Sequence, residues 1–330
     1  MNLALPGPTP TGRNLRILRL RCTSPDIATN DEKFNPQSAS TKALAWALRD
    51  SRSAIHILDL NLSHNVIGDT GAEALAHLGV IRTLEKLKLN VGNANIGDSG
   101  ATCLAALGHP DGSLRTLQLE LFWNLITPKG AIGLSDLGLS RTLHTLRLNL
   151  EGNAIQNAGA EALSTLTSSD DSNLLVLELN LRDNFIGDAG ACALAKLLKS
   201  SISGKRPSKL RICELDLQSN CIGDTGATAL AEQLNTWSLD CIMSDVGPPL
   251  HDVKLLLQGN HEISDISTDQ FRAVLRSVDY KETGRRSCIR RSCIIHIDDL
   301  AFDYCVEAFN FSCRDLVSAA TRGHPGAYGI

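Results

Sequence analysis

The residues best suited to bind a metal ion lie near the carboxyl end of the chain. Cys288, Cys293, Cys305 and Cys313 surround His296, and thiolates and imidazoles are the usual ligands of zinc. Such sites are normally built from paired C-x-x-C units, and the spacing of these four cysteines contains no such pair. We therefore predict no metal site and no cofactor.

Catalytic motifs give no stronger signal. The sequence contains no H-E-x-x-H, no Walker loop, no G-x-S-x-G and no G-x-G-x-x-G, so the common hydrolytic and nucleotide-binding chemistries lack their characteristic residues. The neighbouring carboxylates of Asp298 and Asp299 are typical of a solvated turn. We predict that the chain is not an enzyme.

Composition limits the class of partner. Of 330 residues, 43% are hydrophobic and 21% are charged, which excludes a disordered chain. The net charge of −4 argues against nucleic acid as a partner. The sequence has no apolar run of roughly 18 residues that would span a membrane, and its start lacks the apolar segment of a signal peptide. We therefore expect reduced cysteines and a cytoplasmic location, with the nucleus as the alternative.

The dominant pattern is an internal repeat of about thirty residues. The clearest copy starts at Leu143 and reads L-x-x-L-x-L-x-L-x-x-N-x-I-x-x-x-G-A-x-A-L-x-x-L. Other copies start at Ile55, Leu84, Leu114, Leu174, Leu210 and Leu250, with half a copy at Leu15. The L-x-L-x-L part alternates as a strand does, and the G-A-x-A-L-x-x-L part has helical spacing. Regular strand–helix units that stack side by side predict an α/β solenoid.

Two polar positions recur in most copies of the repeat. The amide after the strand can bond its own loop and the next coil, which predicts a structural ladder of Asn65, Asn124, Asn153, Asn184, Asn220 and Asn260. The copy from Leu84 has Ala94 in this place, so either its loop shifts by one residue or that rung is weak. Helix N-caps are expected at Asp69, Asp98, Asp188, Asp224 and Asn157, and at Thr127 before Pro128.

These repeats resemble the leucine-rich repeat family and, within it, the ribonuclease-inhibitor-like type, over roughly residues 15–278. The resemblance implies a horseshoe with parallel strands on the concave face and helices on the convex face. It also implies a function in binding other proteins. The present repeat carries an extra L-x pair, as in LRLNLEGN, so we expect a longer strand than is usual in the family.

The chain divides into three predicted parts. Residues 1–14 are a flexible N-terminus, residues 15–278 a solenoid of about eight units, and residues 279–330 a tail. The tail opens with a tandem RRSCI-RRSCI, whose role the sequence does not give. A helical stripe of Phe302, Val306 and Phe309 follows, and we predict a capping helix at 300–321 that covers the last unit. A partner-binding amphipathic segment and an aberrant or disordered end are the alternatives.

The residues between the strand leucines form the predicted partner-binding face. Phe122 and Trp123 are the predicted anchor, because buried aromatic side chains dominate many interfaces. Alternation predicts that Phe122 is exposed and Trp123 borderline, with rings folded back onto the loop as the alternative. The other predicted partner-binding residues are Arg147, Asn149, Glu151, Asn180 and Arg182. Asn149 and Asn180 belong to a second asparagine series that either pairs across strands or accepts a partner's side chains.

The leading functional hypothesis is a monomeric, noncatalytic scaffold or adaptor that binds a protein partner on its concave face. A regulator of a small GTPase is the alternative, because the repeats resemble those of Ran GTPase-activating proteins. That group carries a strongly acidic C-terminal stretch, whereas the tail here is basic and aromatic. A third possibility, the sensor portion of an immune-type receptor, is weakened because the chain has no room for a nucleotide-binding module.

Overall fold

A single ten-stranded sheet runs through the molecule, with its strands in sequence order. The computed structural model describes residues 17–22, 36–50, 55–110, 112–169, 172–198, 209–243, 250, 252–280, 291–297 and 300–306. The strands are β1 (Ile17–Arg21), β2 (Ile57–Asn61), β3 (Lys86–Asn90), β4 (Thr116–Glu120), β5 (Thr145–Asn149), β6 (Val176–Asn180), β7 (Ile212–Asp216), β8 (Asp252–Leu256), β9 (Arg291–Ile297) and β10 (Leu300–Val306). Each strand, together with its following loop and helix, is called a coil below.

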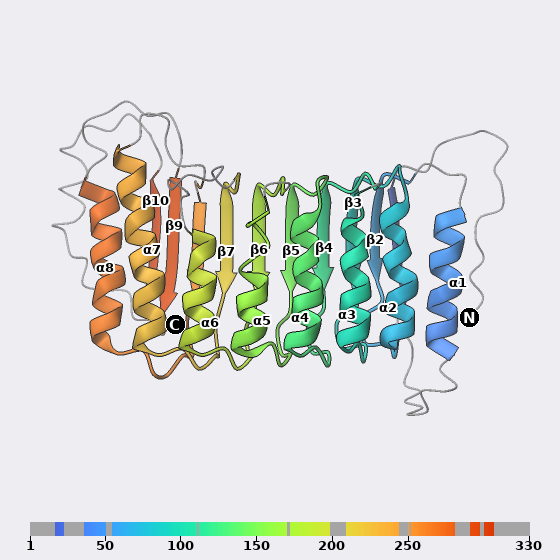
Figure 1. The fold of residues 1–330 in the computed structure, drawn as a ribbon, viewed down its shortest axis with the longest axis horizontal. Coiled ribbons are helices and arrows are strands. Elements are labelled where there is room, and N and C mark those ends of the chain that lie inside the picture. Colours follow the sequence, from blue (N-terminus) through green and yellow to red (C-terminus); the bar gives the residue numbers. More distant parts are fainter. Residues whose placement is uncertain are drawn as a thin grey trace, which may run out of the picture.

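The helices form a second layer on one side of the sheet (Figure 1). The α-helices are α1 (Pro36–Asp50), α2 (Gly68–Ala76), α3 (Asp98–Leu104), α4 (Pro128–Ser135), α5 (Gln156–Leu163), α6 (Asp188–Leu194), α7 (Asp224–Met243) and α8 (Asp265–Tyr280). Short 3₁₀ turns continue some of them: η2 (His77–Val80), η3 (Ala105–Gly108), η4 (Asp136–Leu139) and η5 (Ala195–Leu198).

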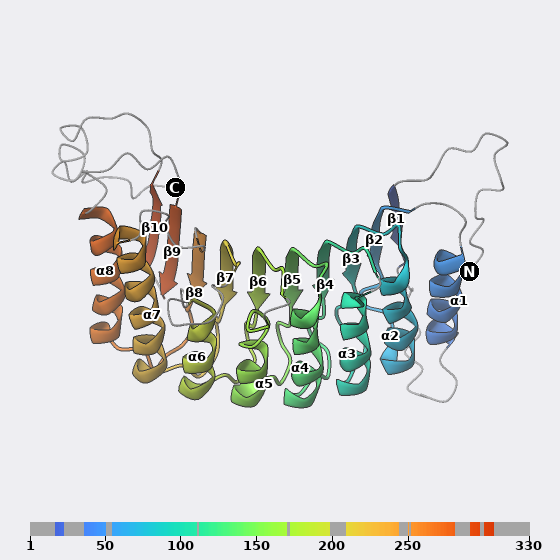
Figure 2. The same ribbon diagram turned by 45° about the horizontal axis from the view of Figure 1, so that its top comes forward.

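The two layers curve into an arc with the strands on its inner side, as Figure 2 shows. Neighbouring strands lie about 4.8 Å apart, whereas a helix with its side chains is about 10 Å wide. Because each coil is wider at its helix than at its strand, stacked coils bend away from the helical layer. The predicted α/β solenoid, with parallel strands on the concave face and helices on the convex face, is confirmed.

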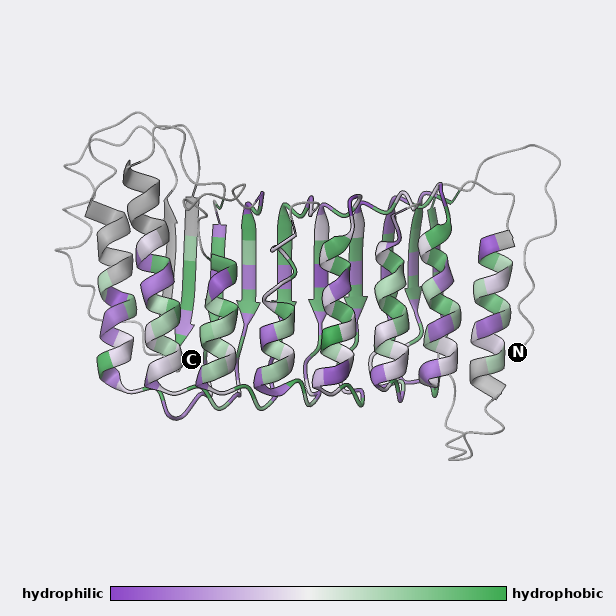
Figure 3. Cartoon of the chain, in the orientation of Figure 1, coloured by the Kyte–Doolittle hydropathy of each residue, from purple (hydrophilic) through white to green (hydrophobic). Residues whose placement is uncertain are grey.

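Leucine spacing fixes the register of the sheet. Leu87 lies opposite Leu58 on one side and Leu117 on the other, and all three are buried. The alternation of apolar and polar residues is visible along the strands in Figure 3. Pairing also continues past the strand ends, where the Val91 nitrogen donates to the Glu120 oxygen at 2.9 Å. The extra L-x pair therefore lengthens the hydrogen-bonded segment into the loop.

The C-terminal end departs from the prediction. Strand β9 pairs parallel to β8, and β10 returns antiparallel to β9. The capping helix predicted at 300–321 is therefore wrong for Leu300–Val306, and the remainder of that range lies outside the described residues. Pairing with β8 satisfies backbone groups that a helix would leave open at the sheet edge.

Strand β9 also completes the end of the core. Cys293, Ile295 and Ile297 are at most 2% exposed and alternate along the strand, which is the two-residue period of a sheet. The predicted boundary at residue 278 falls inside α8, and the division of the chain into three parts stays a prediction. Residues 1–14 lie outside the described residues.

Candidate functional site

Two rows of side chains cross the concave face in the predicted register. The first row consists of Lys88, Gln118, Arg147, Glu178, Glu214 and Lys254. The second row consists of Asn90, Glu120, Asn149, Asn180, Asp216 and Leu256. Nearly all of these side chains are half-buried, because each is flanked by its in-register neighbours while its tip faces the inside of the arc.

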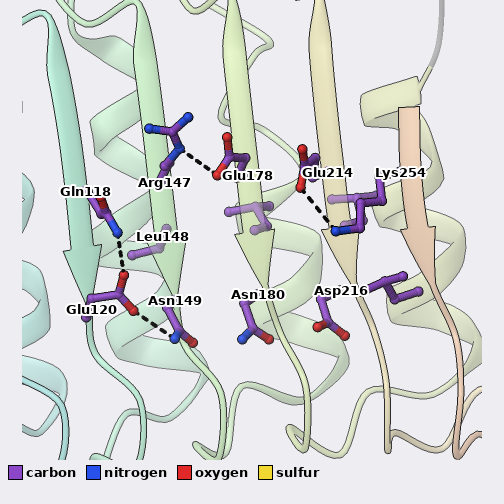
Figure 4. Close-up of a pocket in the computed structure, with 13 residues that line it drawn as sticks. Gln118, Glu120, Arg147, Leu148, Asn149, Glu178, Asn180, Glu214, Asp216 and Lys254 are labelled. Atoms are coloured by element: carbon purple, nitrogen blue, oxygen red, sulfur yellow. Dashed lines mark hydrogen bonds and ion pairs between the residues drawn. The ribbon is translucent and has the colours of Figure 1, made fainter. Parts of the chain in front are cut away.

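The middle of these rows forms an open depression between β4 and β8 (Figure 4). It is lined by Gln118, Glu120, Arg147, Leu148, Asn149, Glu178, Leu179, Asn180, Glu214, Leu215, Asp216, Lys254 and Leu256. Three predicted site residues, Arg147, Asn149 and Asn180, thus share one surface. The other four, Phe122, Trp123, Glu151 and Arg182, are not part of its lining. An open surface of this kind suits a macromolecule better than a small molecule, which needs enclosure.

Two ion pairs order the first row. Arg147 Nε lies 2.6 Å from Glu178 Oε2, and Lys254 Nζ lies 3.8 Å from Glu214 Oε2. All four side chains are between about a quarter and two-fifths exposed, so these pairs add little stability. Their main effect is to fix the direction of the charged groups across β5 to β8.

The second row holds carboxylates in place with amides. Asn149 Nδ2 donates to Glu120 Oε2 at 2.8 Å, and Asn180 Nδ2 donates to Glu151 Oε2 at 3.3 Å. The Oδ1 atom of each asparagine accepts from the backbone two residues later, at Glu151 and Arg182 respectively. These amides therefore neither pair with one another nor stand free. They close the turn after the strand and orient the neighbouring coil's carboxylate.

Asp216 occupies the place of this asparagine in the β7 coil. Its Oδ1 accepts from the Gln218 nitrogen at 3.1 Å. Burial raises the pKa of Asp216, opposed by the Gln218 hydrogen bond and by the positive charges of Arg182 and Lys254. Glu120 and Asp216 were both missed by the predicted set of site residues. Both residues occupy the same repeat position as Asn149 and Asn180, and this shared position in the sequence could have identified them.

The two predicted anchor residues differ in exposure from the prediction, because Trp123 and not Phe122 is the more exposed of the two. Phe122 is half-buried, because its ring lies over Gly92, where a Cβ would overlap it. Trp123 is 58% exposed and lies against Gly152. Its φ of 52° places the backbone in the left-handed region, and its indole lies over the loop of the next coil at Gly152. The rings contact each other edge to face, with centroids 6.3 Å apart.

The amides after the strands bond from coil to coil. Asn124 Nδ2 donates to the carbonyl oxygens of Val91 and Leu121, and its Oδ1 accepts from the nitrogens of Ala94 and Ile96. Equivalent bonds to the preceding coil are made by Asn65, Asn153, Asn184, Asn220 and Asn260. These side chains satisfy loop backbone groups that the leucine core would otherwise leave without partners.

The same strand, asparagine and helix pattern matches a known repeat. Five segments match the Leucine Rich repeat family: residues 53–76, 83–105, 142–164, 172–195 and 214–231. The fold is a leucine-rich repeat solenoid. The β4 coil, which carries Phe122 and Trp123, falls between two matched segments, but its Asn124 makes the full set of bonds. No curated protein matches the chain.

One leucine-rich repeat lacks the ladder asparagine and compensates with its backbone. The Ala94 carbonyl oxygen accepts from the nitrogens of Ile67 and Gly68, at 3.1 and 3.0 Å. The residues on either side, Asn93 and Asn95, have φ of 50° and 55°, a left-handed conformation that asparagine tolerates. A carbonyl group thus takes over the accepting role that the amide oxygen has in the other coils.

A second ladder joins the helices of these repeats. Asp98 Oδ1 accepts from the nitrogens of Thr127 and Gly130 in the next coil, at 2.8 and 2.9 Å. Corresponding acceptors for the next coil are Asp69, Asn157, Asp188 and Asp224. The expectation that these side chains cap their own helices is wrong. Thr127 does cap its own helix, with Pro128 at the next position as expected.

Candidate metal ligands do not gather in the described part of the solenoid. Within the ranges given above, no group of three or more His, Cys, Asp or Glu side chains could hold a metal ion. Cys288 and Cys313 lie outside those ranges. None of the described helices combines the length and the apolar character needed to cross a membrane.

Proposed function

We propose that this chain is a noncatalytic scaffold or adaptor that binds a protein partner through the concave face of its leucine-rich repeats. The observation that carries the proposal is the open inner face of the arc, because every described helix lies on the outer side (Figure 2). Solenoids use such curved surfaces for binding. Seven intervals of about 4.8 Å between β1 and β8 give a face long enough for a standard protein interface.

The proposed contact residues are Phe122, Trp123, Arg147, Asn149, Glu151, Asn180 and Arg182. Arg147, Asn149 and Asn180 support the proposal because their orientations are already fixed by neighbouring side chains. Side chains that are ordered before binding lose less conformational entropy on association. Trp123 contributes the large exposed ring that interface hot spots commonly contain.

Two finer assignments accompany this proposal. A helix after each of β1 to β8, at a repeat length of about thirty residues, supports the ribonuclease-inhibitor-like type. Free thiols at Cys103, Cys192, Cys213 and Cys221 support a reducing compartment such as the cytoplasm. We also propose a protein partner in place of nucleic acid or membrane, and a monomeric state.

Affinity capture followed by mass spectrometry tests the proposal. The wild type is compared with Arg147→Asp/Asn180→Lys on the concave face and with the convex variant Ile132→Asp/Leu139→Lys, because Ile132 and Leu139 are 53% and 60% exposed. We expect proteins recovered with the wild type to be retained by the convex variant and lost by the concave one. Loss only with the convex variant would contradict binding by the concave face.

The GTPase-regulator alternative needs its own assay. The wild-type protein is added to purified small GTPases, and the rate of GTP hydrolysis is measured. We expect no stimulation. Stimulation that the concave variant abolishes would replace the scaffold proposal with the GTPase-regulator alternative.

A further inference from the structure

Apolar side chains are exposed along the edge where the strands of the middle coils end. Leu125 and Phe185 are 65% and 63% exposed, and Trp123 is 58% exposed. Ala154 lies between the coils of Leu125 and Phe185, and its nitrogen donates to the Ile126 oxygen of the preceding coil. These four residues, Trp123, Leu125, Ala154 and Phe185, are called the exit rim. They come a few residues after the ends of β4, β5 and β6.

The two aromatic residues of the exit rim adopt a backbone conformation that disfavours bulky side chains. Trp123 and Phe185 have φ of 52° and 57°, a region in which glycine, asparagine and aspartate are favoured and bulky residues are strained. At the position of Trp123, the other coils carry His64, Asn93, Gly152, Asp183, Ser219 and Gly259, all with positive φ. Strained residues persist where function requires them, and an exposed ring gains little from burial.

The concave face beside the exit rim carries carboxylates that form no ion pair with a described lysine or arginine. Glu120, Glu151 and Asp216 are hydrogen-bonded to amides, but no Lys or Arg within the described ranges lies within 4.0 Å of them. Two of the three cations of the first row are already engaged, because Arg147 pairs with Glu178 and Lys254 pairs with Glu214. Burial raises the pKa of Asp216 although the charges of Arg182 and Lys254 oppose it, so a further cation brought into contact by a partner would be favourable there.

The exit rim and the carboxylates come closest in the backbone at Trp123 and Glu151. The backbone nitrogen of Trp123 donates to the backbone carbonyl oxygen of Glu151 at 2.7 Å. The indole and the Glu151 carboxylate therefore extend from backbone positions that are paired between adjacent coils. A guanidinium group can bond a carboxylate with two N–H groups while its flat face stacks on an aromatic ring. The geometry therefore offers both halves of an arginine site.

We propose that the exit rim and the carboxylates of Glu120, Glu151 and Asp216 together dock an extended segment of a partner protein that alternates basic and apolar side chains. Arginine or lysine side chains meet the carboxylates, with arginine preferred beside Trp123, and apolar side chains cover Leu125 and Phe185. The proposal rests on the proposed function and names the chemistry of the partner.

Synthetic peptides test the charge preference with the full chain. The probes are short peptides of equal length and equal leucine content, whose other positions are all Arg, all Lys, all Gln or all Glu. Affinity is measured by fluorescence anisotropy at physiological salt. We expect the Arg peptide to bind at least about tenfold more tightly than the Gln peptide, and the Glu peptide not to bind.

Matched variants separate this surface from the overall charge. The test variant is Glu120→Gln/Glu151→Gln/Asp216→Asn. The control removes the same charge from exposed convex positions, Glu73→Gln/Glu161→Gln/Glu232→Gln. A second pair compares Trp123→Ser with Leu139→Ser. We expect each rim or carboxylate variant to weaken the Arg peptide about tenfold or more, and each control to leave its affinity unchanged.

Each other outcome overturns the inference in a recognisable way. Equal binding of all four peptides, or binding of none, would refute the inference that the partner segment is basic. The affinity-capture experiment with the concave and convex variants tests the proposed function separately. Equal weakening by the convex control would show nonspecific attraction. Tighter peptide binding by Arg285→Ser/Arg286→Ser/Arg290→Ser/Arg291→Ser would assign the surface to the chain's own basic segment. A dimer that the carboxylate variant dissociates would assign it to a second copy.

Discussion

The Oδ1 atom of Asp98 lies 2.9 Å from the backbone nitrogen of Gly130, which donates a hydrogen bond to it from the next coil. Gly130 lies in the first turn of α4, where a helix leaves backbone N–H groups without partners. A carboxylate there is also favoured by the helix dipole. A Cβ at Gly130 would overlap the same oxygen, so this ladder requires both the carboxylate and the glycine.

Removing this link should weaken the stack of coils. We expect Asp98→Ala to lower the free energy of unfolding by about 1–2 kcal/mol, the usual cost of losing a helix cap. Asp98→Asn should cost less, because Asn157 makes the equivalent bonds to Gly187 and Gly190. Urea unfolding measures both. The exposed neighbour Ser99→Ala is the control, and a loss in Asp98→Ala no larger than in this control would contradict the ladder's role.

The same carboxyl group gives a pH dependence. Desolvation raises the pKa of Asp98, but hydrogen bonds from Thr127 and Gly130 together outweigh it, so the pKa lies below its ordinary 3.8. A carboxyl with a lower pKa in the folded state stabilises the fold above the unfolded pKa, and this contribution disappears as the pH falls through the folded pKa. The stability difference between wild type and Asp98→Asn should therefore be constant near neutral pH and shrink below about pH 4. A difference that is independent of pH down to about pH 2 would contradict this assignment.

The asparagine ladder should matter most where it is buried. Asn124 is 8% exposed, and its side chain is hydrogen-bonded to five backbone groups. We expect Asn124→Ala to cost about 1–3 kcal/mol, because buried donors and acceptors lose their partners. Asn65, near the first coil, is only half-buried, so Asn65→Ala should cost less. Urea unfolding at neutral pH compares the two, and equal or reversed losses would refute this dependence on burial.

The packing of Phe122 can be tested from the other side of the contact. Gly92→Ala places a methyl group where the Phe122 ring lies, and overpacking of this kind costs about 1–3 kcal/mol. Adding Phe122→Ala should remove most of that cost, since the clash disappears. A double-mutant cycle by thermal unfolding measures the coupling. Additive losses would show that the ring does not occupy this space.

Trp123 should show opposite effects on stability and binding. Trp123→Asn places a residue that tolerates the left-handed backbone at φ 52°, so we expect unfolding free energy to stay constant or rise by up to about 1 kcal/mol. Binding of the partner should weaken. A stability loss above about 2 kcal/mol would instead show that the indole is a packing element over Gly152.

Much of this fold follows from local sequence pattern. The spacing of Leu87, Leu117 and their equivalents fixes strand register, and Asn124 stands where its amide can reach two coils. These features repeat in most units, so each copy gives an independent indication of the same strand register. The concave rows follow directly from that register.

The structure differs from the sequence-based predictions where contacts between coils determine the conformation or the hydrogen-bond partner of a residue. Asp98 stands at a position that local rules assign to an N-cap, but its nearest open N–H groups belong to the next helix. Phe122 and Trp123 owe their exposure to glycines in neighbouring coils and to a left-handed backbone, neither of which alternation reveals. Leu300–Val306 show helical spacing with the residues after them, whereas pairing at the open edge of β8 and β9 favours a strand.

Site-specific photo-crosslinking tests the central claim most directly. A photoreactive amino acid is placed at Gln118 on the concave face or at Ile132 on the convex face of the same β4 coil. Binding of a protein partner to the inner surface predicts a crosslinked partner from position 118 and none from position 132. Crosslinks only from position 132 would contradict the account.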